Sequence, residues 1–586
     1  MVLACVAAGT SALPVGDGTT ADGDGHTFTE VARASGIDFT HRSGARGAFL
    51  FPEIMGGGAG WLDFDGDGDL DAYLVDSGET TGLAAADDGA TDPADRRTGN
   101  RLFRNDGRGR FLDVTGRAGV AGRGYGMGVA AGDYDNDGDV DIFVANAGVS
   151  LLERHDGGRA VAAVRAGAAG GASAWSTAGA FFDYEADGDL DLFVANYVDW
   201  SDKPAFTEKR CFSDAGARAY SERQSDDATS EQVPDGQAGD GTFTDVSAAA
   251  GLLERLGTGL GVVSSDLDDD GDVDVYVSND QMPSFAWINQ GDGTFVERAT
   301  LLGCAVDEMG RAQGGMGVDA GDVDGDGDMD LWKVHLHRES HVLYRNLGDY
   351  FEDATTLSGL AAVTRRATGF GTALFDYDLD GLLDAFVANG RVQFVNEPYP
   401  VADPYAEPNQ LLRQTRDGWF EDVSAAAGPA LATVENSRAA AFGDYDNDGD
   451  VDVLVANRDG PARLLRNDAA RLGRPLTLRL TDRAGRDAYG ARVTVAAGGG
   501  RRVFEARAAY SYAATNDPRV HVGVPEGTSV ESVEVRWPDG STSRYPALRT
   551  DRIYALRQPG GRSSETDRRA RAISAGSSPR SRDAAR

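Results

Sequence analysis

Apolar residues recur along most of the chain in short runs whose order is the same in each recurrence. A run with Phe and Val comes first, as at Phe111 and Val114, and a stretch of small, glycine-rich sequence follows, as in residues 124–129. After an acidic stretch comes a third run, as in residues 140–144, and a fourth run resembles Arg101–Asn105. Short apolar runs bounded by turn signals are typical of β-strands. Each recurrence therefore predicts four short strands, and the chain predicts an all-β fold.

The number of recurrences predicts a closed architecture. There are seven between residues 28 and 467, and their acidic stretches lie 50 to 83 residues apart. Four strands per repeat at such a spacing are typical of β-propeller blades. We therefore expect a seven-bladed β-propeller over residues 27–473, with its first and last repeats meeting at one blade boundary. The glycine-rich strands are expected nearest the axis, where small side chains let neighbouring strands approach.

The chain changes character after residue 474. Apolar positions alternate strongly in residues 476–480 and 533–537, Pro538-Asp539-Gly540 is a turn signal, and no acidic stretch occurs. We expect a separate small β-sandwich-like domain at residues 474–558.

Three further segments have a composition that differs from the repeats. Residues 1–26 are expected to be an N-terminal tail or a truncated signal region of a lipoprotein. Residues 201–237, between the third and fourth repeats, are polar and are expected to form a surface loop. Residues 559–586 are rich in Ser, Arg and Gly, which predicts a disordered tail.

Each acidic stretch has the spacing of a cation-binding loop. In the first repeat, positions 1, 3, 5 and 9 are Asp63, Asp65, Asp67 and Asp71, and position 6 is Gly68. Alternate carboxylates of a tight loop turn inward, a backbone carbonyl at position 7 adds a ligand, and glycine takes the left-handed turn. The predicted metal-binding residues, loop by loop, are Asp63, Asp65, Asp67, Asp69 and Asp71; Asp133, Asp135, Asp137, Asp139 and Asp141; Asp183, Glu185, Asp187, Asp189 and Asp191; Asp266, Asp268, Asp270, Asp272 and Asp274; Asp322, Asp324, Asp326, Asp328 and Asp330; Asp376, Asp378, Asp380, Leu382 and Asp384; and Asp444, Asp446, Asp448, Asp450 and Asp452.

Two alternatives for these stretches are a solvated run of charge and an EF-hand. Seven copies of one spacing, each with glycine at position 6, argue against a solvated run. An EF-hand needs a glutamate at position 12, whereas that position is Leu74 in the first loop and Val144 in the second. We therefore expect up to seven Ca²⁺ ions, one per blade. Their role is predicted to be structural, because metal binding relieves the repulsion among the carboxylates and becomes folding energy.

The overall charge narrows the class of partner. The chain has 586 residues and a formal net charge of −38, which disfavours nucleic acid because its phosphates would be repelled. A hydrophobic fraction of 41% is sufficient for a buried core. Lysine occurs only at Lys203, Lys209 and Lys333. This pattern fits both GC-rich coding and a halophilic origin, and composition does not separate them.

A second set of polar residues follows the acidic loops at a constant distance. Five residues after each position-9 aspartate stand Asp76, Asn146, Asn196, Asn279, His335, Asn389 and Asn457. Because a short strand separates the two positions, this set is expected at the opposite face of the blades. One interpretation is that these side chains cap the turns that end the strands. The other is that they form a polar ligand-binding rim around the channel.

Histidine offers one further candidate site. His335 and His337 would share one side of a strand, a spacing that suits a transition metal, and His341 follows closely. The alternative is that they are ordinary surface residues. No nucleophile elbow, P-loop or HExxH motif is present, so no catalytic residues are predicted.

The cysteines and the N-terminus bear on the compartment. The chain has Cys5, Cys211 and Cys304 and no CxxC pair, which excludes a zinc ribbon or a thioredoxin-like site. Cys211 and Cys304 can pair only if the compartment is oxidising and the fold brings them together. Residues 2–5, Val-Leu-Ala-Cys, resemble a bacterial lipobox, so a lipid anchor at Cys5 and a plain tail both stay open. The sequence contains no apolar run of 18 residues, so no transmembrane segment is predicted.

The repeats and the C-terminal region together resemble known sequences. Residues 132–146, Gly-Asp-Tyr-Asp-Asn-Asp-Gly-Asp-Val-Asp-Ile-Phe-Val-Ala-Asn, look like the FG-GAP/VCBS repeat of integrin-like propellers. Residues 490–495, Asn516-Asp517-Pro518 and residues 535–540 look like the ASPIC/UnbV domain. The combination is similar to the cartilage acidic protein family and its bacterial relatives, which implies a secreted calcium-binding propeller. Relatives carry further cysteines in the insert that here contains only Cys211, so the resemblance does not extend to a disulfide there.

Three hypotheses for function follow. The first is an exported, non-enzymatic calcium-binding propeller that binds an extracellular protein or glycan, in a secreted, periplasmic or cell-surface location. The second is a calcium-dependent enzyme of lyase or cyclase type, working at the face opposite the calcium loops, because fold alone does not settle function. The third is an assembly scaffold that docks through its C-terminal β domain.

Overall fold

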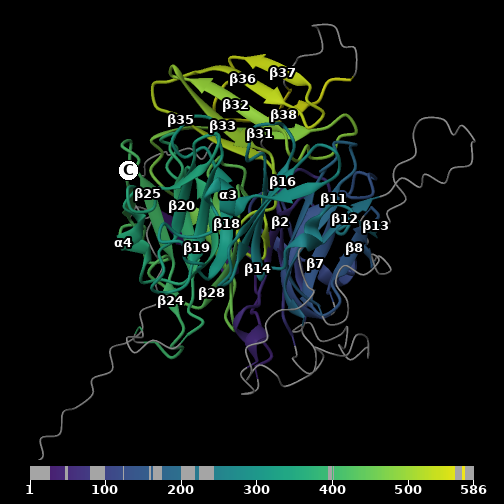
Figure 1. Ribbon diagram of the computed structural model, residues 1–586, viewed down its shortest axis with the longest axis vertical. Coiled ribbons are helices and arrows are strands. Elements are labelled where there is room, and N and C mark those ends of the chain that lie inside the picture. Colours follow the sequence, from purple (N-terminus) through teal and green to yellow (C-terminus); the bar gives the residue numbers. More distant parts are fainter. Residues whose placement is uncertain are drawn as a thin grey trace, which may run out of the picture.

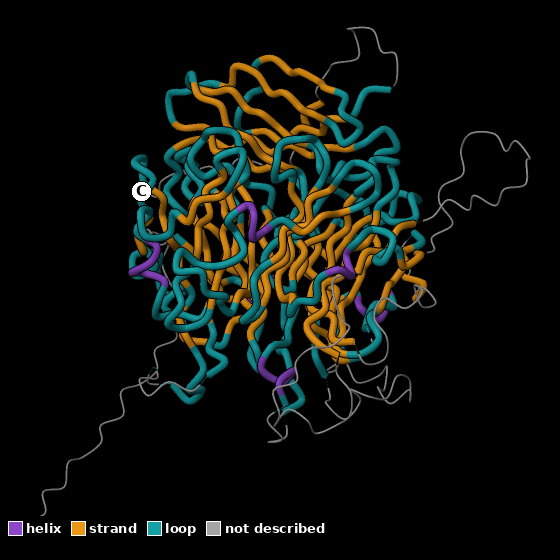
Figure 2. The backbone as a smooth tube through the Cα atoms, in the orientation of Figure 1, coloured by secondary structure: helices purple, strands orange, loops and turns teal. Residues whose placement is uncertain are grey.

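The computed structural model describes residues 27–45, 50–78, 99–122, 124–157, 160–162, 174–199, 218–222, 243–393, 399, 401–560 and 571–573. Strands dominate this part of the chain (Figure 1), and the helices are single short turns (Figure 2). The predicted all-β fold is therefore confirmed. The predictions for residues 1–26, for Cys5 and Cys211, and for most of residues 201–237 and 561–586 lie outside the described residues.

The described strands of the repeats group into antiparallel units of four strands; those of the second and third repeats share one eight-stranded sheet, and those of the first are joined by a strand from the C-terminal region. The first four are β2 (Ala59–Leu62), β3 (Asp71–Leu74), β4 (Arg101–Asn105) and β5 (Phe111–Asp113); β6 (Tyr125–Gly132), β7 (Asp141–Ala147), β8 (Leu151–His155) and β9 (Ala160–Ala162); β10 (Ala174–Phe182), β11 (Asp191–Asp199), β12 (Arg218–Glu222) and β13 (Phe243–Asp245); and β14 (Gly259–Ser265), β15 (Asp274–Asn279), β16 (Phe285–Asn289) and β17 (Phe295–Glu297).

The remaining three units follow the same order of strands. They are β18 (Gly315–Gly321), β19 (Asp330–His335), β20 (Val342–Asn346) and β21 (Phe351–Asp353); β22 (Gly369–Phe375), β23 (Asp384–Asn389), β25 (Gln410–Gln414) and β26 (Phe420–Asp422); and β28 (Ser437–Gly443), β29 (Asp452–Asn457), β30 (Arg463–Asn467) and β1 (Phe28–Glu30). A small extra pair, β24 (Glu407–Pro408) and β27 (Val434–Glu435), links the last two units.

The units are arranged in a propeller-like ring. The first strand of each unit contacts the first strand of the next, and β28 of the last unit contacts β2 of the first. The chain ends of the repeat region meet in one sheet, because β1 pairs with β30 and Phe28 lies opposite Asn467. The expected meeting of the first and last repeats is therefore observed.

Small residues let the first strands approach one another. A Cβ built on Gly261 would lie 2.2 Å from the Met316 carbonyl oxygen of the next unit, and one on Gly317 would lie 2.1 Å from the Phe370 carbonyl oxygen. Real Cβ atoms do not tolerate such contacts. The predicted reason for glycine in these strands is confirmed.

One expectation for the repeat region is wrong. Residues 201–237 were expected to be only a surface loop, but they contain β12, which pairs with β11 and β13 as the third strand of its unit. The polar composition of this segment gives no apolar run from which a strand is predicted.

The C-terminal residues form two further sheets above the ring (Figure 1). One contains β35 (Val520–Pro525), β31 (Gly473–Thr481), β38 (Arg552–Arg557) and β39 (Arg571–Ile573), and the other contains β33 (Gly500–Glu505), β32 (Arg492–Ala497), β36 (Val530–Arg536) and β37 (Thr542–Pro546). Their facing side chains, among them Leu478, Val493, Val535 and Trp537, make one buried apolar cluster. This pair of sheets is called the C-terminal domain below.

The C-terminal domain also contributes a segment to the ring. Its residues 506–519, called the plug, reach the first strands of the ring, where β34 (Ala514–Thr515) pairs in parallel with β2. Tyr512 and Ala513 belong to the same buried cluster as residues of several repeat units. The plug therefore supplies part of the core at the ring's centre.

Short helices and one cysteine complete the description. The helical turns are α1 (Ala32–Ser35), α2 (Thr115–Ala118), α3 (Ala299–Leu302), α4 (Leu360–Thr364), η1 (Phe51–Ile54) and η4 (Leu252–Glu254). Among the described residues, no helix has the length and apolar character needed to cross a membrane. Cys304 is a buried free thiol within an apolar cluster, and its proposed partner Cys211 is not described.

Candidate functional site

Each acidic stretch is a tight loop between the first and second strands of its unit. In the first loop, Gly68 has a φ of 91°, and its N–H donates to Asp63 Oδ2 at 3.0 Å. The other six glycines at position 6 have φ values between 88° and 110°. A side chain is strained in this region of backbone space. The predicted left-handed turn at position 6 is therefore confirmed.

The loops gather carboxylate oxygens. Groups with one oxygen from each residue, all within 4.8 Å of one another, include Asp63, Asp65 and Asp67; Asp133, Asp135 and Asp141; Asp266, Asp268 and Asp274; and Asp322, Asp324 and Asp326. The Oδ1 atoms of Asp63, Asp135 and Asp266 are buried and accept no hydrogen bond within the described residues. An orphaned, buried carboxylate oxygen is costly unless a cation binds it. The donors present therefore fit a hard cation such as Ca²⁺.

The position-9 aspartates have a second task that the sequence did not predict. Asp71 Oδ2 accepts the backbone N–H of Phe64 at 3.0 Å, and Asp71 Oδ1 accepts that of Asn105 at 2.7 Å. The first of these bonds recurs in all seven loops, with donors from the residue at position 2. Position 9 therefore holds the loop against the end of the third strand while its remaining lone pairs stay open to a cation.

Without a metal ion, burial raises the pKa of carboxyl groups in the acidic loops. Burial raises the pKa of Asp71, Asp141 and Asp330 to about 8, and neighbouring carboxylates add to the effect. At position 1, burial raises the pKa of Asp133 to about 6 and that of Asp183 to about 7. Desolvation and like charges disfavour the ionised carboxylate. A bound divalent cation would favour ionisation instead and so stabilise the loop.

Amide side chains tie five of the loops to a neighbouring unit. Asn289, at the end of β16, donates from Nδ2 to the Tyr184 carbonyl oxygen of the third loop at 2.7 Å. Four other repeats make the same bond from the end of their third strand, with Asn105, Asn346, Gln414 and Asn467 as donors. In the second unit His155 stands at this position and stacks on Phe64 instead. The signal for these residues was a polar residue ending each third apolar run, as in Arg463–Asn467.

The C-terminal domain covers the face of the ring that carries the acidic loops (Figure 1). Arg479 Nη1 lies 3.2 Å from Asp63 Oδ2, and Arg536 pairs with Asp266. The Val503 N–H donates to Asp322 Oδ2 at 3.1 Å. Position-1 aspartates from three repeats therefore contact this domain directly. The acidic loops form an internal seam rather than an open surface at these points.

The plug closes the ring's axis from the same side. Tyr512 is 1% exposed, its hydroxyl donates to the Met55 carbonyl oxygen at 2.7 Å, and its ring meets Phe370 edge-on at 5.0 Å. Ser511 bonds to two further units through its backbone and its hydroxyl. The centre of the ring is filled with side chains here.

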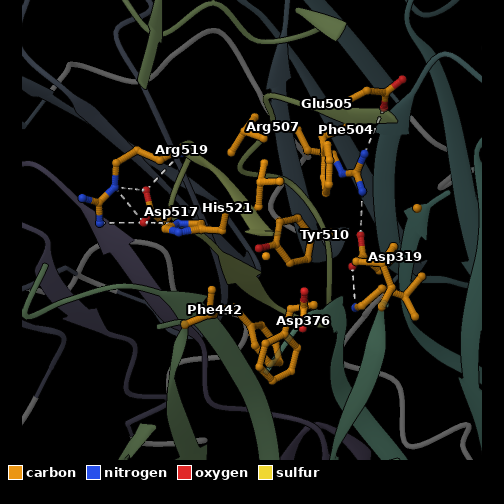
Figure 3. Close-up of a pocket in the computed structure, with 18 of the residues that line it drawn as sticks. Asp319, Asp376, Phe442, Phe504, Glu505, Arg507, Tyr510, Asp517, Arg519 and His521 are labelled. Atoms are coloured by element: carbon orange, nitrogen blue, oxygen red, sulfur yellow. Dashed lines mark hydrogen bonds and ion pairs between the residues drawn. The ribbon is translucent and has the colours of Figure 1, made fainter. Parts of the chain in front are cut away.

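A cavity of about 100 Å³ lies between the C-terminal domain and the fifth to seventh units. Figure 3 shows Tyr510 between two charged clusters. On one side Arg507 lies 3.0 Å from Asp319 and 2.9 Å from Glu505. On the other, burial opposes ionisation of Asp517, but Arg519 and His521 outweigh it and hold the pKa of this carboxyl well below its usual range. The charges that line the cavity are thus paired with one another.

The seven residues expected at the opposite face are buried. Asn279, Asn389 and Asn457 are each at most 1% exposed. Their Nδ2 atoms donate to backbone carbonyl oxygens of Pro283, Pro408 and Pro461 in the turns that follow. Asn146 makes the equivalent bond to Val149. These four side chains thus cap the turns that end their strands.

The first residue of this set departs from the pattern. Asp76 pairs with Arg42, and its carboxylate also accepts the backbone N–H groups of Arg42 and Gly99. The Asn196 side chain bonds Ser176 Oγ at 2.8 Å. Both side chains therefore hold loops together, which is again a structural task.

The histidines do not form the expected pair. β19 ends at His335, and His337 lies in the following turn, where its Nδ1 contacts the Arg366 carbonyl oxygen at 2.8 Å. His341 Nδ1 accepts the backbone N–H of His335 at 3.1 Å. The expectation that His335 and His337 share one side of a strand is wrong, because the strand stops between them.

One contact between a serine and a histidine resembles a catalytic pair, but here the histidine donates the hydrogen bond instead of accepting it. His41 Nε2 lies 2.9 Å from Ser77 Oγ, while His41 Nδ1 accepts the Asp459 backbone N–H. The proton of neutral His41 is therefore on Nε2, and burial lowers the pKa of this histidine to about 4. Ser77 in turn donates to the Gly126 carbonyl oxygen. His41 cannot act as a base toward Ser77 in this arrangement.

Family models match both regions of the chain. The FG-GAP-like repeat matches residues 63–144, 266–332 and 401–455, and the model described as ASPIC and UnbV matches residues 481–563. These segments of the chain thus match FG-GAP-like repeats, followed by an ASPIC and UnbV domain. These matches confirm the resemblance on which the sequence interpretation rests.

Curated relatives and solved structures add further likenesses. The chain is 27% identical over 316 residues to cartilage acidic protein 1 of Homo sapiens, covering 50% of this chain and 43% of that protein. The Xenopus tropicalis protein of the same name is 25% identical and is covered to 44%. The chain thus spans less than half the length of these relatives.

Solved structures align with about 70% of the chain at low identity. Rhamnogalacturonan lyase YesW aligns with a TM-score of 0.36 and 14% identity, covering 70% of this chain and 71% of that one. YCF48 bound to a D1 peptide aligns with a TM-score of 0.37 and 9% identity, covering 70% of this chain and 91% of that one. At TM-scores below 0.5, neither likeness bears on function.

Proposed function

We propose that this chain of FG-GAP-like repeats and an ASPIC and UnbV domain is an exported, calcium-binding, seven-bladed β-propeller. It binds a protein or glycan partner outside the cytosol, and its calcium ions are structural. Location is secreted, periplasmic or at the cell surface, with Cys5 as a lipid anchor if the N-terminal residues are processed as a lipoprotein.

One observation carries the structural role of calcium: acidic loops lie beneath the C-terminal domain. Asp63, Asp266 and Asp322 each contact that domain. The domain therefore covers the position-1 side of these loops, while the carboxylates at positions 3 and 5 stay exposed. An ion held there fixes the loop against the strands and the domain above it, and its binding energy adds to the stability of the whole chain.

The same observation assigns the partner to other surfaces. The C-terminal domain occupies the acidic-loop face, and the plug fills the axis on that side. Among the described residues, the C-terminal domain does not contact the face at the other ends of the second strands, so we assign the partner to that face. The outer strands β17, β21 and β26 are three residues long and end in Glu297, Asp353 and Asp422. Short, charged edge strands discourage pairing with another sheet.

The first test measures how calcium changes the thermal stability of the purified full chain. The chain is stripped with a chelator and unfolded by heat with no metal, with Mg²⁺ or with Ca²⁺, beside elemental analysis of bound metal. A site at one hundred times its dissociation constant stabilises by about 2.7 kcal/mol, so several loops together should raise Tm by at least about 10 °C. Mg²⁺ should do less, because it demands a smaller octahedral site.

Two outcomes would contradict the proposal. Little bound metal and an unchanged Tm would mean that the acidic repeats serve solubility. A screen against glycans and matrix or envelope proteins in Ca²⁺ that found no binding would remove the partner-binding role while leaving the structural metal intact.

A further inference from the structure

The ring face opposite the acidic loops carries a compact group of unpaired positive charge. Each second strand starts at an acidic loop, so its far end lies on this face, called the free face below. β19 ends there at His335, and α4 ends nearby at Thr364. The turns that follow contain Arg338, Arg365 and Arg366, called the arginine cluster.

Backbone hydrogen bonds hold the arginine cluster together. The Arg338 N–H donates to the Arg365 carbonyl oxygen at 2.8 Å. His337 Nδ1 contacts the Arg366 carbonyl oxygen at 2.8 Å, and the His337 N–H donates to Thr368 Oγ1 at 3.1 Å. The three arginines are therefore neighbours on one surface, and all three side chains are exposed.

The guanidinium groups have no carboxylate partners among the described residues, although acids outnumber bases 94 to 56 in the chain. The nearby acids are engaged elsewhere. Glu339 accepts the Gly314 N–H at 2.8 Å, and Glu407 pairs with Arg391 at 2.7 Å. Within the described part of this acidic chain, three adjacent cations thus have no carboxylate partner.

Arg338 also occupies a backbone position that disfavours it. Its φ is 75°, and corresponding turns of other units also have a residue with positive φ: Gly78 and Gly148 in the first and second units, and Gln281 and Asp459 in the fourth and seventh. An L side chain with positive φ is strained where glycine is not.

An aromatic ring borders the arginine cluster. Tyr399 is 39% exposed, and the Arg391 guanidinium lies 5.6 Å from its ring centroid. Burial and the charge of Glu407 raise the pKa of Tyr399, and the charges of Arg391 and Arg366 oppose that rise. A tyrosine offers an apolar face together with a polar edge, which suits the alternating apolar and hydroxyl surfaces of a sugar.

We propose that the arginine cluster and Tyr399 form a binding site for an acidic glycan, one that carries sulfate or carboxylate groups. Guanidinium groups bind both groups with paired hydrogen bonds. Nucleic acid is the less suitable polyanion, because duplex DNA carries one charge per ~1.7 Å and this chain has a net charge of −38. A glycan with one anionic group on each sugar, or on every second sugar, meets less repulsion.

Binding of the calcium-loaded full chain to three polymers tests this site. The polymers are heparin, polygalacturonate and neutral dextran, each measured at about 50 mM and about 150 mM salt. The wild-type chain should bind at least one of the acidic glycans, more weakly at high salt, and should not bind dextran. The triple variant R338Q/R365Q/R366Q should lose at least about tenfold in affinity.

A matched control separates local from global charge. R544Q/R549Q/R552Q removes three exposed arginines that have no ion pair, all from the C-terminal domain, and should bind within about twofold of wild type. An equal loss in both triple variants would overturn the site, because net charge would then explain the binding. Tighter binding of duplex DNA than of either glycan would overturn the assignment of the ligand.

A single substitution separates binding from folding. Arg338→Gly removes the charge and relieves the backbone strain, so Tm should not fall while affinity does. Unchanged affinity would remove Arg338 from the site. The site rests on the proposed partner-binding function. If Ca²⁺ stabilises the chain but neither acidic glycan binds, this inference fails and the calcium-binding propeller stands.

Discussion

The two faces of the ring invite opposite interpretations, and the structure reverses them. The acidic-loop face holds the aspartates that look most like an active site, yet Asp63 and Asp266 are paired with arginines of the C-terminal domain. The free face looked like the place for a polar rim, yet Asn279 and Asn389 are buried turn caps. On that face the arginine cluster is exposed to solvent and has no carboxylate partner among the described residues.

The difference shows that the density of polar residues is a poor guide to where a partner binds. Buried acidic residues at the covered face have a structural role, because the charge of each loop must be neutralised before another domain can pack against it. Exposed cations at the free face have no such internal task. Experiments that treat the faces separately therefore test the comparison.

The largest expected effect is a pH dependence of stabilisation by calcium. Burial raises the pKa of Asp71, Asp141 and Asp330 to about 8 in the metal-free fold, against about 4 in an unfolded chain. Between pH 5 and 8 the metal-free fold holds protons that the unfolded chain has lost, so its stability falls as pH rises. Calcium removes this loss.

We expect the rise in Tm caused by calcium to be at least about 10 °C larger at pH 8 than at pH 5. Thermal unfolding of stripped and calcium-loaded chain across this range gives the measurement. Equal calcium shifts at both pH values would show that the loops do not titrate as buried acids.

The next effect concerns the plug. Tyr512→Ala removes a fully buried ring and its hydrogen bond to Met55, and should cost about 3–5 kcal/mol of unfolding free energy. Tyr350 is 52% exposed, and Tyr350→Ala should change stability by at most about 0.5 kcal/mol. Chemical denaturation of both variants in calcium compares them. Similar midpoints would mean that the plug does not support the ring.

A smaller effect separates two asparagines of the fourth unit. Asn289, at the acidic-loop face, donates to two carbonyl oxygens and accepts the Gly291 N–H. Asn279, at the free face, donates to Pro283. Asn289→Ala should cost about 2–3 kcal/mol and Asn279→Ala about 1 kcal/mol. The reverse order in thermal unfolding would contradict the view that the covered face holds neighbouring units together.

Much of the ring was predictable because its cause is local. Gly68 and its six equivalents lie within loops whose spacing dictates a left-handed turn, and β1 lies beside β30 because a ring must close. The acidic loops were predictable for the same reason. Carboxylates at alternate positions of a short loop can turn to one point, whatever the rest of the chain does.

The parts that escaped prediction depend on contacts between distant segments. Tyr512 lies in a stretch of the C-terminal domain without a distinctive motif. No pattern near it in the sequence predicts its contacts with Met55 and Phe370. From the sequence alone, Asn289 is interpreted as a turn residue. Its hydrogen bond to the third loop becomes evident only in the folded structure. β12 was missed because its polar segment has no apolar alternation. Local pattern identifies the repeats, whereas long-range packing decides which face stays open.

The smallest expected effect comes from a comparison of two arginines on opposite faces of the ring. Arg536 pairs with Asp266 at the acidic-loop face, where a guanidinium and a calcium ion seek the same carboxylate. Arg536→Gln should therefore strengthen calcium binding at the fourth loop by about threefold, the equivalent of roughly 0.7 kcal/mol. Arg338→Gln, on the free face, should leave calcium binding unchanged. Calcium titration calorimetry of the two variants beside wild type gives the comparison. Weaker calcium binding in Arg536→Gln would show that the arginine shapes the loop rather than competing for it, and the covered face would then depend on both cations together.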